Sequence, residues 1–360
     1  MTQAKQDAPR GGTEFEAGHH LTVGDKSYRW DNIWAGYEGT GWSHSGIAAL
    51  QDGSVVFAHP EGHRLVRVLP GGEAQEIHTE LTEMHAIVAA PLAGREALWV
   101  ADNGSRYCHG TPDYHEELNV GRVAALDMDG AIRQEIHCPD LPAYAENGWR
   151  PTTVAVDGQT GDIWVGDGYG ASLVHCFDAA GQLRFTLDGT EAGKHFASPH
   201  GIHIRLGGGE REVYVADRGN RRIVVYGLDG AFRRVVGVGH LSSPSSLAEL
   251  DGILLVTELS GALAMFDGDD FRGHAGQSGR NTADEGWPNQ RSHDGNVTRA
   301  STPPGVFNSP HGIAVQGGHI LLTEWMVGGR FTRLSPDACV TAPLCSGHVV
   351  DLKHEHSGNS

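Results

Sequence analysis

An internal repeat runs through most of this chain. Each unit has a small or polar residue, a few apolar residues, a turn with Gly or Asp, and a second apolar run that usually ends in an acid. The six units begin at residues 44, 85, 152, 200, 245 and 311. Each continues into further strands, joined by turns such as DMDG, DAAG or GLDG. Short strands at about 45 residues per unit are typical of the four-stranded antiparallel blades of a β-propeller.

Six units predict an all-β fold, a six-bladed β-propeller around a central channel, whose ring closure leaves no free sheet edge. We expect one propeller domain over residues 21–352, between a flexible N-terminal tail at 1–20 and a C-terminal tail at 353–360. Residues 21–34 are expected to add a strand to the last blade and so fasten the ring. Two insertions, 103–122 and 272–305, interrupt the repeat, and segments of this kind are either lids or flexible loops.

Composition narrows the possible partners. The formal net charge is −18, which disfavours binding to nucleic acid or to an anionic membrane. No apolar run is long enough to span a bilayer, and the first twenty residues do not resemble a signal peptide. The five cysteines form no CxxC pair, which favours a reducing cytoplasm. We therefore expect a cytoplasmic protein that acts on a small molecule; the sequence carries no signal for an oligomeric state.

Histidines recur at one position of the repeat. When the units are aligned on the apolar residue two places later, this position reads Ser45, His85, Thr152, His200, Ser245 and His311. Because the first strand of each blade lines the channel, histidines on alternate blades would converge on the axis. Three imidazoles with an open coordination position suit a catalytic zinc, or iron, nickel or copper. The alternative is that these histidines only line the channel and bind water.

The ends of the second strands supply further candidates. A recurring acid there either holds turns or supports a ligand histidine. Near it stand His59, Asn103, Tyr169, Arg218 and Trp325, while His44 is a candidate pocket residue at the start of the first unit. A tyrosine beside a metal can transfer a proton, and an arginine can bind a carboxylate through two hydrogen bonds. On pattern alone, both could equally be residues of the channel rim.

The stretch VYVADRGNRRIVVY at 213–226 and the PHGI segments resemble NHL-repeat propellers. More narrowly, the chain resembles the peptidyl-α-hydroxyglycine α-amidating lyase family. That resemblance implies zinc on His85, His200 and His311, a catalytic tyrosine at Tyr169 in DGY, and a catalytic arginine at Arg218. It also implies a structural calcium on the backbone carbonyls of Ile47, Ile87 and Ile313. The chain departs from the family at His59, where the family has a substrate-binding arginine, and at Gly170, where it has a disulfide cysteine.

These residues support the hypothesis of a metal-dependent lyase. The metal would bind the hydroxyl of a carbinolamide-like or other hydroxylated small molecule, and Tyr169, assisted by His59, would take its proton. Arg218 would orient a carboxylate or neutralise negative charge, and a carbonyl product would form. One alternative is a metal-dependent hydrolase such as a lactonase, although six-bladed lactonases usually hold their metal with carboxylates and asparagine. The other is a non-catalytic NHL-repeat binding module.

Overall fold

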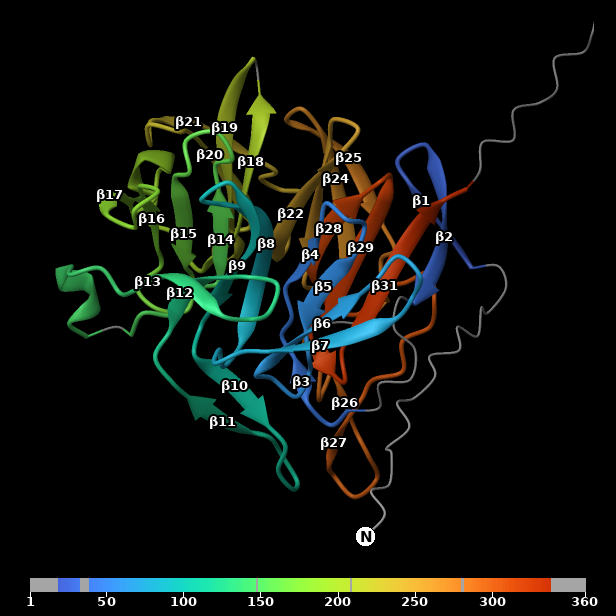
Figure 1. The fold of residues 1–360 in the computed structure, drawn as a ribbon. Helices are drawn as coiled ribbons and strands as arrows, with labels where there is room; N and C mark the ends of the chain where they lie inside the picture. The colour runs from blue at the N-terminus through green and yellow to red at the C-terminus, as the bar shows by residue number, and fades with distance from the viewer. Residues whose placement is uncertain (1–18, 33–38, 147, 208, 280–281, 338–360) are drawn as a thin grey trace, which may run out of the picture.

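The computed structural model describes residues 19–32, 39–146, 148–207, 209–279 and 282–337, which form a six-bladed β-propeller (Figure 1). The strands of the first five blades are β4 (Ile47–Ala49), β5 (Val55–Ala58), β6 (Arg64–Val68) and β7 (Ala74–His78); β8 (Met84–Leu92), β9 (Arg95–Asp102), β12 (Arg122–Leu126) and β13 (Ile132–Ile136); β14 (Thr153–Val156), β15 (Ile163–Asp167), β16 (Leu173–Phe177) and β17 (Leu183–Leu187); β18 (Pro199–Gly207), β19 (Glu210–Asp217), β20 (Arg222–Gly227) and β21 (Phe232–Val236); and β22 (Pro244–Leu250), β23 (Ile253–Glu258), β24 (Ala262–Asp267) and β25 (Asp270–Ala275). The predicted fold class is confirmed.

The last blade joins the two ends of the chain. Its five strands run in the order β28 (Pro310–Gln316), β29 (His319–Glu324), β31 (Arg330–Pro336), β2 (Lys26–Asn32) and β1 (His20–Val23). β2 pairs antiparallel with β31, placing Trp30 opposite Leu334. The N-terminal stretch thus closes the ring as expected, and adds two strands rather than one. Three parts of the predicted terminal regions lie outside the described residues. They are residues 33 and 34, most of the predicted N-terminal tail, and the C-terminal segment beyond 337.

The core lies between the blades. The described residues form six apolar clusters, one at each interface between neighbouring blades. Trp99 of blade two, for example, packs with Val165 of blade three. Both faces of a blade are covered by its neighbours, so inner strands such as β20 are buried along their whole length. Each fully buried Val, Leu or Ile contributes roughly 1.5–3 kcal/mol, and these interfaces fix the blades around the axis.

Both predicted insertions contain hairpins. The first carries β10 (Ser105–Cys108) and β11 (His115–Leu118), and the second carries β26 (Gln290–Arg291) and β27 (Val297–Thr298). The expected start of the second insertion at 272 is wrong, because residues 272–275 belong to β25, the outer strand of blade five. Both hairpins lie at one end of the propeller, away from the β18–β19 turn (Figure 1). There β3 (Trp42–Ser43) also pairs with β30 (Met326–Val327).

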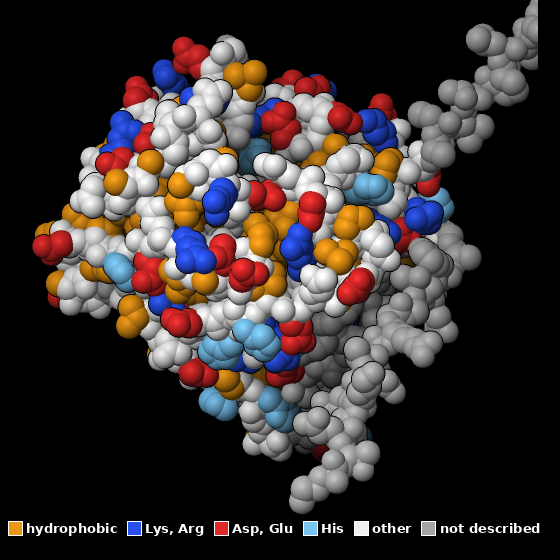
Figure 2. All heavy atoms as spheres, viewed as in Figure 1, with side chains coloured by type: hydrophobic (Ala, Val, Ile, Leu, Met, Phe, Trp, Pro, Cys, Tyr) orange, Lys and Arg blue, Asp and Glu red, His pale blue; other side chains and the backbone are white. Residues whose placement is uncertain are grey.

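Helix is confined to single turns. The described residues form three 3-10 helices, η1 (Pro142–Tyr144), η2 (Thr190–Ala192) and η3 (Arg218–Asn220). In the part of the chain that the structure describes, no helix has the length and apolar character needed to cross a membrane. Acidic and basic side chains are interspersed over the face seen in Figure 2.

The first strand of each blade lines the channel. The six aligned apolar residues Ile47, Ile87, Val154, Ile202, Leu247 and Ile313 surround a cavity of about 50 Å³. A cavity of this volume admits only a very small molecule or ion, so protein atoms almost fill the channel at this level. The three isoleucines named for a calcium ion line this cavity, and the calcium stays a prediction.

Candidate metal centre

Three histidines from alternate blades meet in the channel. His85 on β8, His200 on β18 and His311 on β28 are each 1% exposed. Their ring centroids are 4.7 Å apart for His85 and His200, 4.5 Å for His85 and His311, and 5.1 Å for His200 and His311. The structure therefore brings together the three residues that the repeat predicted.

A fourth histidine completes the group. His44 enters from the segment between β3 and β4, and the ligand atoms of all four histidines lie within 4.8 Å of one another. Its ring centroid is 4.3 Å from that of His85 and 4.6 Å from that of His311. The sequence analysis gave His44 only as a pocket residue. The sequence did offer a signal: His44 directly precedes Ser45, the aligned residue of a blade that has no histidine at the aligned position.

Backbone carbonyls of the other three blades orient the imidazoles. Nδ1 of each channel histidine donates to the carbonyl of the aligned hydroxyl residue on the next blade: His85 to Thr152 at 2.6 Å, His200 to Ser245 at 3.3 Å, and His311 to Ser45 at 3.3 Å. A carbonyl oxygen can only accept, so the proton of each neutral ring is on Nδ1 and the lone pair is on Nε2. This explains the alternation of histidine and hydroxyl residues around the channel.

The hydroxyl side chains have a different task, which is to tie backbones together. Thr152 Oγ1, for instance, donates to the Pro199 carbonyl at 2.7 Å. Glycines next to two of the histidines make the close approach of the blades possible. A Cβ at Gly201 would overlap the Ser245 carbonyl oxygen, and one at Gly312 would lie 2.9 Å from the Ser45 carbonyl oxygen. The HG pairs of the sequence therefore serve the histidine–carbonyl contacts.

The Nε2 atoms face one another. Nε2 of His85 and Nε2 of His311 are 3.2 Å apart, and both carry lone pairs. Two acceptors at this distance repel unless a cation lies between them. Two nitrogens bound to one tetrahedral zinc ion at roughly 2.0–2.1 Å would be roughly 3.3 Å apart, so the donor set fits a divalent transition metal. The carbonyl contacts at Nδ1 are also those that ligand histidines normally make.

The surroundings keep these rings neutral. Burial, with the neighbouring imidazoles, holds the pKa of His44 and His85 well below the usual range. Burial and the charge of Arg218 do the same for His200, and they lower the pKa of His311 to about 3. A neutral imidazole is the form that binds metal, so the lone pairs are available near neutral pH.

Tyr169 places its hydroxyl at the centre of the group. Its Oη lies 3.0 Å from Nε2 of His200, 3.3 Å from Nε2 of His85 and 3.3 Å from Nε2 of His44. Arg218 donates to the same oxygen from Nη2 at 3.3 Å, and its guanidinium lies 5.5 Å from the centre of the tyrosine ring. Two of the three residues that the sequence named as catalytic candidates thus contact each other beside the histidines.

His59 does not join them. The sequence analysis grouped it with the residues near the recurring acid, but the strand register places it at the acid position itself. It follows Phe57 by two residues, as Asp102 follows Val100, and both Phe57 and Val100 pair with the aligned isoleucine of their blade. Its ring accepts from the Glu61 backbone at 3.0 Å and contacts Arg64. These contacts tie the His59 ring to its own blade, and its proton-transfer role stays a prediction.

The recurring acids hold the loops that lead into the first strands. Asp102 accepts from the backbone of Thr82 and Glu83 at 2.9 Å, just before His85. Asp217 accepts from Ala197 at 2.8 Å, before His200, and similar contacts are made by Asp167, Glu258 and Glu324. They therefore position the histidine strands from a distance.

The remaining two candidates differ. Trp325 lies near the cluster, with its ring 5.5 Å from that of His44. Asn103 is buried at the end of β9, where its side-chain oxygen accepts from Ser105 at 2.8 Å and its Nδ2 finds no hydrogen-bond partner among the described residues.

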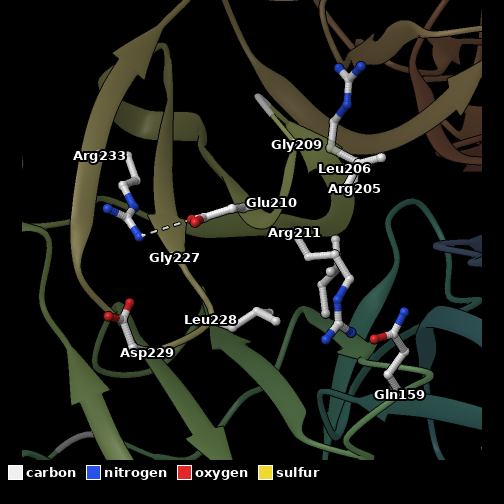
Figure 3. A pocket seen from close by; sticks show the side chains of 11 residues that line it. Gln159, Arg205, Leu206, Gly209, Glu210, Arg211, Gly227, Leu228, Asp229 and Arg233 are labelled. Carbon is white, nitrogen blue, oxygen red and sulfur yellow. Dashed lines mark ion pairs between the residues drawn. The ribbon is translucent and has the colours of Figure 1, made fainter.

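A larger pocket lies far from this chemistry. It has a volume of about 750 Å³ and is formed near the β18–β19 turn, at the other end of the propeller (Figure 3). Its charges are engaged: Arg233 faces Glu210 at 3.7 Å, and Arg211 pairs with Asp157. The described residues that line it include no histidine or cysteine, so the channel cluster is the stronger candidate site.

Comparisons with known proteins support the fold of this chain. No profile of a known protein family matches the chain, and a search of curated proteins found no match. Among solved structures, it is similar to a streptogramin B lyase, at 16% identity and a TM-score of 0.53, covering 86% of this chain and 98% of that one. A gluconolactonase from Xanthomonas campestris matches at 15% identity and a TM-score of 0.52, covering 89% and 96%. A catalytically inactive virginiamycin B lyase from Staphylococcus aureus with quinupristin matches at 11% identity and a TM-score of 0.50, covering 86% and 99%. At these identities the likeness concerns the propeller fold alone.

Proposed function

We propose that this protein is a metal-dependent lyase that splits a carbinolamide-like or other hydroxylated small molecule into a carbonyl product and an amide or amine. The observation that carries the proposal is the pair of facing lone pairs on Nε2 of His85 and His311, 3.2 Å apart. His85, His200 and His311 would hold zinc or another divalent transition metal. Such an ion, when bound, polarises a hydroxyl oxygen and makes its proton easier to remove.

The residues of the chain would then move one proton. Tyr169 Oη, within 3.3 Å of three imidazole nitrogens, would act as a phenolate that takes the proton of the substrate hydroxyl. The electrons of the O–H bond form the carbonyl, the C–N bond breaks, and the leaving nitrogen takes the proton back from Tyr169. Arg218, which donates to the same oxygen, stabilises the negative charge that develops during this transfer.

The setting favours a small substrate. Beyond the histidines the channel holds only the cavity of about 50 Å³, so a ligand would approach from the end that carries the insertions. We propose that the protein acts in the cytoplasm and that it has a single propeller domain. A calcium on the carbonyls of Ile47, Ile87 and Ile313 is proposed as a separate, structural ion.

Elemental analysis of the purified protein, combined with turnover assays, tests the proposal. We expect about one transition-metal ion per chain, loss of this metal in His200→Ala, and its retention in His175→Gln, a buried histidine of blade three. The same analysis reports calcium. A wild-type protein that binds no stoichiometric transition metal would reject the metal site and favour a binding module.

Two probe substrates separate the enzymatic alternatives. An N-acyl-α-hydroxyglycine should release glyoxylate and the amide, whereas a γ-lactone should remain intact. Opening of the lactone, with an oxygen atom from labelled water in the product, would instead identify a hydrolase. Chelation should stop whichever reaction occurs.

A further inference from the structure

The two insertions contact each other and form one structure at one end of the propeller. The loop between β10 and β11 belongs to blade two, whereas β26 and β27 lie between blades five and six, yet the Val297 backbone donates to the Pro112 carbonyl at 3.1 Å. Arg291 pairs with Asp113 at 2.8 Å across the same junction. Figure 1 shows both hairpins at the same end of the molecule. Segments that interrupt the repeat at separate places therefore build a common structure at the end where a ligand would approach.

A pocket of about 330 Å³ lies between these hairpins. It is lined by both insertions, through Tyr114 on one side and Thr298 and Arg299 on the other, while Val327 of β30 and Thr40, which precedes β3, also contribute. Tyr114 Oη donates to the Thr40 carbonyl at 2.5 Å, which fixes the first hairpin to the propeller. The volume suits a small organic group.

Arg299 is the cation of this pocket, and no acid lines it. In the part of the chain that the structure describes, its guanidinium has neither an ion pair nor a hydrogen bond, and the nearby acids are engaged. Asp113 pairs with Arg291 at 2.8 Å, and Glu324 pairs with Arg330. An unpaired arginine in a pocket without acids is notable in a chain of net charge −18.

Two further features describe the surroundings of the guanidinium. A Cβ at Gly328 would come within 2.8 Å of Arg299 Nη1, so glycine leaves the space that the guanidinium uses. Burial and the charge of Arg330 lower the pKa of Arg299. Arg299 as a whole is exposed, so an anionic ligand can reach its guanidinium from the pocket.

Aromatic rings connect the pocket to the histidines. Trp42 lies 5.3 Å from Tyr114 of the pocket and 5.5 Å from Trp325, whose ring is 5.5 Å from His44. The buried indole nitrogens of Trp42, Trp287 and Trp325 have no hydrogen-bond partner among the described residues. A row of packed aromatic rings therefore lies between the pocket and the histidine cluster, and flat apolar surfaces of this kind suit a planar ligand.

We propose that this pocket is a carboxylate subsite, in which Arg299 binds the carboxylate of an aryl or other planar acid whose reacting part lies at the histidine cluster. The assignment to the substrate rests on the proposed function. Arg218, named above as a possible carboxylate ligand, contacts Tyr169 through Nη2, and the carboxylate is assigned to Arg299 instead. One guanidinium matches the single charge of a carboxylate, whereas a phosphate dianion would call for a second cation.

Binding of benzoate, followed by ligand-observed NMR, tests the subsite without any turnover. We expect Arg299→Met to weaken benzoate binding roughly tenfold or more, and Arg299→Lys to weaken it less. Arg272→Met, which removes an exposed arginine of blade five, should bind benzoate as the wild type does. Thermal unfolding of each variant checks that it is folded, and Arg299→Lys keeps the test informative if Arg299→Met is not.

Other ligands and variants decide the remaining outcomes. Neutral benzamide should bind at least tenfold more weakly than benzoate; equal binding would overturn the anion site. Inorganic phosphate that binds more tightly than benzoate would reassign the pocket to phosphoryl ligands and overturn the carboxylate assignment.

His200→Ala should keep benzoate binding at the pocket while losing metal. Benzoate binding that disappears in His200→Ala but persists in Arg299→Met would place the anion at the cluster and overturn the subsite, whatever the metal content of the wild type.

Discussion

Two settings of buried histidine can be compared in this propeller. In the core of blade three, His175 is fully buried, its Nε2 lies 2.7 Å from the Tyr144 hydroxyl, and its Nδ1 lies 2.9 Å from Thr186 Oγ1. In the channel, His85, His200 and His311 are equally buried, but only Nδ1 of each is bound to a backbone carbonyl. The two settings share burial and differ in what the second nitrogen faces.

The histidine pKa values alone would not distinguish the two settings. Burial lowers the pKa of His175 to about 4, and burial with the charge of Arg218 lowers that of His311 to about 3. Both are therefore neutral near pH 7. What distinguishes the channel is convergence: the Nε2 atoms of its histidines lie around one point, where His85 and His200 share the single hydroxyl of Tyr169, whereas each nitrogen of His175 has a hydroxyl partner of its own. A metal site is thus recognised by the direction of its lone pairs rather than by depth.

The largest expected effect comes from removing one histidine in each setting. His85→Ala should abolish bound metal and reduce turnover by about 10³-fold or more, because the remaining donors no longer enclose an ion. His175→Gln, which keeps a polar group between two hydroxyls, should retain both metal and turnover. Elemental analysis and steady-state kinetics measure this contrast. Equal metal loss in the two variants would mean that burial, not convergence, governs binding.

Tyr169→Phe should separate binding from chemistry inside the channel. Only the hydroxyl is removed, so the metal should stay at the wild-type level while kcat falls by roughly 10²–10⁴-fold, the range of a lost proton-transfer group. Arg218→Met removes the donor to the same oxygen and should have a smaller effect on kcat. An unchanged kcat in Tyr169→Phe would contradict the proton-transfer role.

The fold could be predicted because it is encoded locally and then repeated. Each blade pairs its aligned apolar residue with the middle of the next strand, as with Ile87 and Val100 or Ile202 and Val215. A constant register brings the same repeat position to the same ring of the channel. His85, His200 and His311 could therefore be placed together without any knowledge of the loops.

The parts that sequence reasoning missed do not follow the repeat. His44 lies one residue before the aligned position, and its side chain reaches the channel because of how the chain enters blade one. His59 was aligned by its chemistry rather than by its register, and blade one lacks the acid that would have marked the correct position. The contact between Val297 and Pro112 joins two aperiodic insertions, and no local pattern reports such a pairing.

Gly201→Ala should disturb the channel through the backbone. The added methyl would overlap the Ser245 carbonyl, the acceptor of the His200 Nδ1 proton, so we expect a loss of roughly 2–4 kcal/mol in unfolding free energy and weaker metal binding. Gly193→Ala is a control for added bulk in open surroundings, although its backbone φ of +94° carries a strain of its own. Chemical denaturation and metal titration compare the two. A Gly201→Ala protein with wild-type metal affinity would show that the carbonyl contact does not orient His200.

The smallest effect concerns His175 and pH. Its pKa is about 4 in the folded protein against an ordinary 6.5, so the unfolded chain binds a proton between these values while the folded chain does not. The contribution of His175 to stability is therefore constant above pH 6.5 and falls as the pH is lowered toward 4, by about 2 kcal/mol at pH 5. His175→Gln removes this titration, so denaturation curves at pH 7.5 and pH 5 should show the variant losing less stability than the wild type. An equal loss in both proteins would mean that the hydroxyl partners of His175 rearrange to accept its charge, and the core setting would then resemble the channel in tolerating a cation.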